Sequence, residues 1–421
     1  MQSSIKLRLT VMNFLQFAVW GAYLTSMGRY LGTAGFGSEI GNFYAMQGLV
    51  SLFMPALMGI VADRWIPAQR LLGVCHTLAG MLMLGVFLYT QTDAPSYPSL
   101  FALYSLSVAF YMPTLALSNS VAYTSLDQAG LDLVKSFPPI RVFGTVGFIC
   151  TMIAVSLLGL EATSGQFAVS AIISLVLAVY AQTLPNCPTA PKGQSKSLVE
   201  ALGLRAFVLF KQRKMALFFI FSMLLGVSLQ ITNGFANPFI STFGEIPAYA
   251  DTFGVKYANI LISLSQLSET LCILLIPFAL RRFGIRRVML IAMVAWVLRF
   301  ALLGLGNPGS GVWLFLLSMI VYGVAFDFFN VSGSLFVDKE TDPSIRSSAQ
   351  GLFMIMTNGI GATLGSLGAQ AVINRFVYSQ SEATAILSGW TMSWYIFAAY
   401  AAVVAVLFAL LFRYNTATEA K

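Results

Sequence analysis

The sequence is poor in charge and in the residues that carry enzyme chemistry. Only 10% of its 421 residues are charged, and it contains one histidine and four cysteines, with no Cys-x-x-Cys pair. A soluble domain is about one-quarter charged, so the composition excludes a soluble protein. Widely spaced cysteines predict neither a disulfide framework nor a metal site. We find no nucleophile–base pair and no phosphate-binding loop, so we expect neither an enzyme nor a bound cofactor.

Apolar sequence is abundant instead. Hydrophobic residues make up 57% of the chain, and the mean hydropathy is +0.79. Because about 20 apolar residues cross a bilayer, the long runs predict an all-α membrane protein with twelve transmembrane helices. The predicted spans are residues 9–31, 40–62, 71–91, 99–122, 139–159, 166–184, 216–241, 257–280, 287–305, 312–337, 347–374 and 390–412.

The net charge of +8 indicates membrane topology. Cytoplasmic segments are enriched in Lys and Arg. With the N-terminus inside, all but four of the 24 Lys and Arg residues fall on cytoplasmic segments, the exceptions being Arg29, Lys256, Arg299 and Arg375. The charge therefore requires no nucleic-acid partner, and both termini are predicted to be cytoplasmic. Arg299 is expected near the outer interface, with its side chain reaching the polar headgroups.

A faint internal repeat divides the chain. "SVAFYMP" (107–113) aligns with "GVAFDFF" (323–329), and two weaker matches occur in the same order. We therefore predict an N-terminal six-helix half (1–184), a cytoplasmic linker (185–214) and a C-terminal six-helix half (215–421). Two such pseudo-repeats are typical of a secondary transporter with its site at the membrane midplane between the halves.

The stretch "GIVADRWIPAQRLL" (59–72) resembles the loop between spans two and three of the major facilitator superfamily. Gly59 is expected to let helices approach closely. Asp63 is expected to accept hydrogen bonds from a helix end, while Arg64 and Arg70 pair across the cytoplasmic face. The second glycine of the superfamily pattern is replaced by Ile66. The resemblance implies a major facilitator fold in which this loop holds the halves together in the outward-facing state.

Polar side chains inside the spans are spaced for single helix faces. Residues three or four apart are neighbours on a helix, and amides at such positions also join transmembrane helices to one another. Carboxylates within spans mark substrate or ion paths more strongly. The polar and aromatic groups are Arg141, Thr145 and Phe148; Gln230 and Asn233; Gln266 and Glu269; and Tyr322, Phe326 and Asp327.

Other polar residues have weaker patterns. Asn13, Gln16 and Trp20 are spaced along one face of the first span and are predicted to line the same cavity. His76 lies one turn into the third span, where a structural role is expected more than a proton relay.

These residue types fit more than one ligand. A nucleobase has a flat π-face and an edge of donors and acceptors, and a ribose offers two adjacent hydroxyls to a carboxylate. Amides, an acid and a phenylalanine face therefore suit a nucleoside as well as a sugar. A proton symporter for a sugar or oligosaccharide, or a nucleoside sensor that does not transport, stays open at this point.

Motifs across the chain resemble the nucleoside:H⁺ symporter family. They include "FPPIRVFGTVGFI", "FFIFSMLLGVSLQITN", "SLSQLSETL" and "MIVYGVAFDFFNVSGSLFV", and the resemblance covers residues 5–414. It implies proton-driven nucleoside uptake across a bacterial inner membrane, and it implies that all ten polar and aromatic residues named above bind substrate. Asp327 or Glu269 would carry the coupled proton. We expect a monomer whose partners are the nucleoside and the lipid bilayer.

Overall fold

The computed structural model describes residues 2–189, 204–343 and 345–414, and all regular structure in these ranges is helical. Residues 190–203 of the predicted linker lie outside the described residues. Within the described residues, nine helical segments are long and apolar enough to cross a membrane: Gly37–Arg64, Ala68–Tyr89, Tyr97–Gln128, Lys135–Leu157, Arg213–Glu245, Ala258–Leu305, Val312–Glu340, Ser348–Phe376 and Ala383–Leu411. Gly165–Ala181 is a shorter apolar helix.

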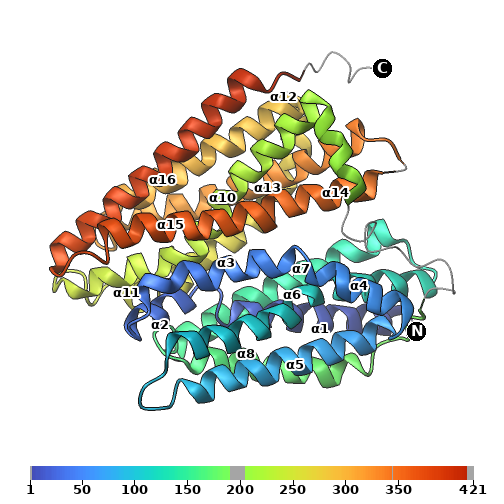
Figure 1. The fold of residues 1–421 in the computed structure, drawn as a ribbon, viewed down its shortest axis with the longest axis horizontal. Coiled ribbons are helices and arrows are strands. Elements are labelled where there is room, and N and C mark those ends of the chain that lie inside the picture. The colour runs from blue at the N-terminus through green and yellow to red at the C-terminus, as the bar shows by residue number, and fades with distance from the viewer. Residues whose placement is uncertain (1, 190–203, 344, 415–421) are drawn as a thin grey trace. The chain divides into compact units, whose positions relative to one another are not determined.

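The chain forms two compact units, and within each the long helices lie side by side (Figure 1). Unit 1 comprises Met1–Phe36 and Leu49–Leu202, and unit 2 comprises Gly37–Gly48 and Gly203–Lys421. Residues 37–48, from the first half of the sequence, thus pack within unit 2. There the Gln370 side chain accepts a hydrogen bond from the Gly41 amide at 2.5 Å and donates one to the Gly37 carbonyl at 3.0 Å.

Unit 1 is built on one apolar core. Its helices are α1 (Gln2–Gly21), α2 (Met27–Thr33), α4 (Met54–Arg64), α5 (Ala68–Tyr89), α6 (Tyr97–Gln128), α7 (Leu133–Leu157) and α8 (Gly165–Ala181), while α3 (Ile40–Ser51) begins in unit 2 and ends in unit 1. α1 packs on α7 and α8, and α5 packs on α6 and α8. Leu9, Leu72, Leu126 and Leu177 are fully buried between these helices.

The first predicted span is interrupted. The sequence predicts one helix over 9–31, but α1 ends at Gly21 and α2 begins at Met27. Between them the amides of Tyr23 and Ser26 bond to carbonyls three residues back, which tightens the turn.

Unit 2 contains the longer helices. They are α10 (Arg213–Thr242), α11 (Phe253–Lys256), α12 (Ala258–Leu305), α13 (Val312–Glu340), α14 (Arg346–Met354), α15 (Ala362–Phe376) and α16 (Ala383–Leu411), with short helices η1 (Gly37–Glu39), η2 (Leu204–Lys211) and η3 (Phe243–Glu245) and a π-helical segment η4 (Ile355–Gly361). α12 packs most extensively on α13 and also contacts α16.

The helical backbone conformation of α12 is interrupted at one residue, Gly284. Gly284 has φ 73° and ψ 164°, a conformation that only glycine adopts easily. The break falls between the predicted spans 257–280 and 287–305. A single glycine therefore separates the two spans.

The span predicted over 347–374 is divided among α14, η4 and α15. The π-helical segment lies where α10 comes very close to it. A Cβ added at Gly226 would lie 2.3 Å from the Thr357 carbonyl oxygen, and one at Gly365 would lie 2.0 Å from that of Val227. Glycine at these positions allows the two backbones to touch, as at other tight transmembrane interfaces.

Candidate functional site

Helical spacing brings the amides of α10 together. Gln230 and Asn233 are three residues apart, and the Asn233 amide donates a hydrogen bond of 2.7 Å to Gln230 Oε1. Gln230 is 9% exposed and Asn233 is half-buried. The predicted contact between these two side chains is confirmed.

Tyr322 and Phe326 on α13 also meet as their spacing predicts. Their rings stack with centroids 5.6 Å apart and an interplanar angle of 16°. The Trp296 and Tyr322 rings pack in a T-shaped arrangement, with centroids 5.9 Å apart and an interplanar angle of 88°. The Gln266 side chain lies near the Tyr322 hydroxyl. An amide and two stacked aromatic faces thus lie together between α12 and α13.

A close backbone contact brings the two acids near each other. A Cβ at Gly323 would lie 2.5 Å from the Ser268 carbonyl oxygen, and the Ser268 hydroxyl donates to the Ile320 carbonyl. Glu269 follows Ser268, and Asp327 lies one helical turn after Gly323. The two carboxyl groups are consequently close enough to interact electrostatically.

Asp327 is the more deeply buried acid. It is 5% exposed, and its Oδ2 has no hydrogen-bond partner in the described residues. Glu269 is half-buried. A buried acceptor without a partner is costly unless it binds a proton or a ligand. Asp327 therefore has the chemistry expected of a proton or hydroxyl ligand.

Arg299 corrects the sequence-based expectation. It was expected to reach the outer interface, but it is 2% exposed. Its Nη1 donates to the Ser318 carbonyl at 2.9 Å, and its guanidinium lies 4.5 Å from the centroid of the Tyr322 ring. The signal in the sequence was an arginine in the middle of an apolar run, which marks a buried functional group when it faces protein.

Unit 1 places its three predicted residues on α7. The Arg141 guanidinium lies 4.0 Å from the centroid of the Phe17 ring, and Phe148 contacts Trp20 edge to face at 6.3 Å. Thr145, which lies between Arg141 and Phe148 in the sequence, is half-buried. Glycine permits this packing, because a Cβ at Gly147 would lie 2.1 Å from the Phe14 carbonyl oxygen. Trp20 is thus an additional aromatic beside Phe148.

His76 belongs to a closed hydrogen-bond network. Its Nε2 lies 2.9 Å from Gln16 Oε1 and its Nδ1 lies 2.9 Å from the Ser174 hydroxyl. Gln16 Nε2 donates to the Thr114 hydroxyl at 2.7 Å. Gln16 and His76 are both 0% exposed, so Gln16 is bonded within unit 1 rather than presented to a cavity as predicted.

Asn13 is likewise buried, since its side-chain amide donates to the Leu9 carbonyl of its own helix at 3.1 Å. Of the three residues predicted to line a cavity from the first span, Trp20 alone remains half-buried.

The loop between α4 and α5 lies at the surface of the described structure. Arg64 and Arg70 are exposed and Asp63 is half-buried. A Cβ at Gly59 would meet no atom within 4 Å, so the expected close helix approach at this glycine is absent from the described structure. The role of this loop in conformational change stays a prediction.

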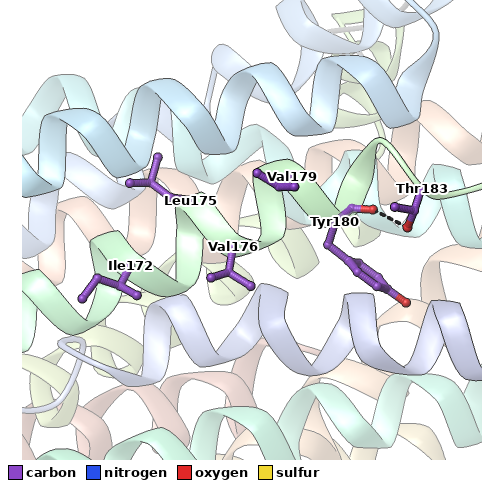
Figure 2. A pocket seen from close by; sticks show the side chains of 6 residues that line it. All are labelled: Ile172, Leu175, Val176, Val179, Tyr180 and Thr183. Atoms are coloured by element: carbon purple, nitrogen blue, oxygen red, sulfur yellow. Dashed lines mark hydrogen bonds between the residues drawn. The ribbon is translucent and has the colours of Figure 1, made fainter.

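A surface groove lies apart from all of these residues. It runs along the outer side of α8, and none of the predicted site residues lines it (Figure 2). Its lining residues are Ile172, Leu175, Val176, Val179, Tyr180 and Thr183. Apolar, exposed side chains dominate it, as expected of a surface in contact with lipid. In the described ranges, no three His, Cys, Asp or Glu side chains converge as metal ligands.

Long apolar helices that bury acids, amides and an arginine define an all-helical membrane transporter. The chain matches the family described as Nucleoside H+ symporter over residues 3–417. It is 49% identical to the xanthosine permease of Escherichia coli (strain K12), over 98% of this chain and 97% of that protein. It is 47% identical to the nucleoside permease NupG of the same strain, with the same coverage.

The fold agrees with this match. The structure superposes on the crystal structure of a mutant of the nucleoside transporter NupG with a TM-score of 0.91 at 45% identity, covering 97% of this chain and 100% of that one. The chain belongs to the nucleoside H⁺ symporter family. It is a proton-coupled nucleoside transporter and a multi-pass inner-membrane protein, not an enzyme, and the family resemblance seen in the sequence is confirmed.

Proposed function

We propose that this symporter binds nucleosides through ten side chains and moves the coupled proton on Asp327. Gln230, Asn233 and Gln266 hydrogen-bond the nucleoside, Phe326 stacks on the base, and Glu269 accepts the ribose hydroxyls. Tyr322 packs beside Phe326. The proposal also assigns Arg141, Thr145 and Phe148, all on α7, to substrate binding.

The observation that carries the proposal is the buried, unpartnered Oδ2 of Asp327. A neutral carboxyl group costs far less to bury than a carboxylate. Protonation therefore makes the loaded site compatible with an interior from which water is excluded. Loss of the proton leaves two nearby negative charges, Asp327 and Glu269, whose repulsion favours the release of substrate from this arrangement.

The transport cycle follows the same reasoning. We propose that the carrier alternates between outward-facing and inward-facing states, and that proton and nucleoside together stabilise the occluded state. A ligand shifts such an equilibrium only through different affinities for the two states. No cofactor takes part, and the proton is the coupling ion.

The membrane arrangement is part of the proposal. The nine long segments become twelve spans when α12 is counted as two at Gly284 and when α1 and α8 are added. We propose two six-helix halves, 1–184 and 215–421, joined by 185–214, with both termini cytoplasmic and the chain acting as a monomer.

Counterflow in proteoliposomes tests the function. Vesicles loaded with uridine should exchange it for labelled uridine, and an inward pH gradient should drive accumulation above the external concentration. Unlabelled nucleosides should compete with the label and unlabelled sugars should not. Competition by sugars alone would contradict nucleoside transport, and accumulation that ignores the pH gradient would contradict proton coupling.

A further inference from the structure

Arg299 is a cation in the interior of unit 2 that the proposed function does not use. It is 2% exposed, on the part of α12 that follows Gly284. Its bonded partners are uncharged: Nη1 donates to the Ser318 carbonyl at 2.9 Å and lies 3.4 Å from the Ser265 hydroxyl. Among the described residues no carboxylate pairs with it, and its Nε has no hydrogen-bond partner.

A buried cation requires compensation from its surroundings. Here the principal partner is the π-face of Tyr322, whose centroid lies 4.5 Å from the guanidinium carbon. Cation–π attraction grows when both groups are removed from water, and arginine stacks on aromatic faces better than lysine does. The guanidinium thus lies over one face of the Tyr322 ring.

The Tyr322 ring in turn orders the proposed substrate-binding groups. Phe326 stacks on it with ring centroids 5.6 Å apart, and Gln266 lies near its hydroxyl. The Trp296 ring packs against Tyr322 in a T-shaped arrangement with centroids 5.9 Å apart. A tilt of Tyr322 would move both the aromatic face and the amide.

We propose that Arg299 is a positioning residue for nucleoside binding, acting through Tyr322. It does not touch the substrate. It holds the Tyr322 ring in the plane that keeps Phe326 and Gln266 in place. This inference rests on the proposed binding site, and it adds a residue that no spacing pattern in the sequence connects to that site.

A double-mutant cycle on the purified full chain tests the inference, with labelled uridine binding as the measurement. Arg299→Gln keeps a donor for the Ser318 carbonyl and removes the cation, so it should weaken uridine affinity about tenfold. Tyr322→Ala should weaken it about as much. The double variant should bind no more weakly than Tyr322→Ala alone, because Arg299 then has nothing left to position.

Two further variants separate positioning from folding. Arg299→Lys keeps a cation near the ring but lacks the planar stacking surface, so it should weaken uridine affinity less than Arg299→Gln does. Arg286→Gln is the matched control, since Arg286 is another α12 arginine that donates only to carbonyls, those of Phe412 at 2.6 Å and Ala409 at 2.7 Å. It should leave affinity unchanged. If Arg299→Gln yields no folded carrier, the cycle is run with Arg299→Met.

The inference is wrong if the Arg299 and Tyr322 substitutions weaken uridine affinity independently of each other. A double variant with about a hundredfold loss, the product of the single losses, would show that Arg299 does not act through Tyr322. Wild-type affinity in Arg299→Gln would do the same. Unchanged binding by Gln266→Ala and Phe326→Ala, with the Arg299–Tyr322 coupling intact, would instead overturn the proposed substrate contacts and leave the pairing.

Discussion

Replacing Asp327 with asparagine separates substrate binding from proton coupling. The side chain keeps its size and shape but loses its titratable proton. Because Oδ2 of Asp327 has no hydrogen-bond partner in the part of the chain that the structure describes, the exchange breaks no existing bond at that atom. We therefore expect uridine affinity and counterflow to stay within about threefold of wild type.

Coupling should be lost entirely. One pH unit across the membrane is worth about 1.36 kcal/mol per proton, which supports about tenfold accumulation for each proton carried. Asp327→Asn carries no proton at this position, so its accumulation ratio should fall to about one while exchange continues. The assay measures internal and external uridine in proteoliposomes with the outside at pH 6 and the inside one unit higher.

Glu269→Gln is the matched variant, because it neutralises the neighbouring acid. We expect it to reduce uridine affinity about tenfold, through the loss of a charged hydrogen-bond acceptor for the ribose, and to leave accumulation proton-dependent. Tenfold accumulation by Asp327→Asn would refute the coupling role. Tenfold accumulation by Asp327→Asn together with loss of accumulation in Glu269→Gln would identify Glu269 as the residue that carries the proton.

Three further substitutions test the surrounding structure. Phe326→Ala should weaken nucleoside affinity about tenfold or more, since stacking on a base is worth about 1–3 kcal/mol, with little change in the pH dependence of uptake; a binding titration at several pH values measures both. Gly323→Ala should lower the melting temperature and nucleoside binding together, because its Cβ would lie 2.5 Å from the Ser268 carbonyl oxygen; Gly368→Ala, where nothing lies within 4 Å, is the control. His76→Leu should destabilise unit 1 by about 1–3 kcal/mol through unpaired buried groups, seen as a lower melting temperature with unchanged proton coupling.

For each of these three predictions, one result would contradict the reasoning. A pH profile that shifts in Phe326→Ala while affinity holds would contradict stacking on the base. Equal stability of the two glycine variants would contradict the close contact of α12 and α13. Loss of coupling in His76→Leu, with normal stability, would make that histidine part of the proton path.

Periodicity in the sequence was enough to predict contacts along single helices. The bond between Gln230 and Asn233 and the stacking of Tyr322 on Phe326 both follow from 3.6 residues per turn. Composition and hydropathy established the class of membrane protein in the same way, because the length and polarity of each span are fixed by the bilayer.

Contacts between helices depended on tertiary structure. The sequence placed Arg299 at the membrane surface, whereas packing of α12 on α13 sets it against Tyr322. The sequence directed Gln16 toward a cavity, whereas α5 brings His76 to it and closes a network. Side-chain spacing fixes which face of a helix a residue occupies, but not which helix that face meets.

The sequence by itself determined the membrane class, the family and the residue types that suit a nucleoside and a proton, but not the interruptions within the spans 9–31 and 347–374. The tertiary structure alone decided that Asp327 lies near Glu269 and keeps a carboxylate oxygen without a partner. The physical reason is the backbone contact at Gly323, which needs a glycine on one helix and a matching carbonyl on another. The glycine is visible in the sequence, but only the packed fold places the Ser268 carbonyl against it.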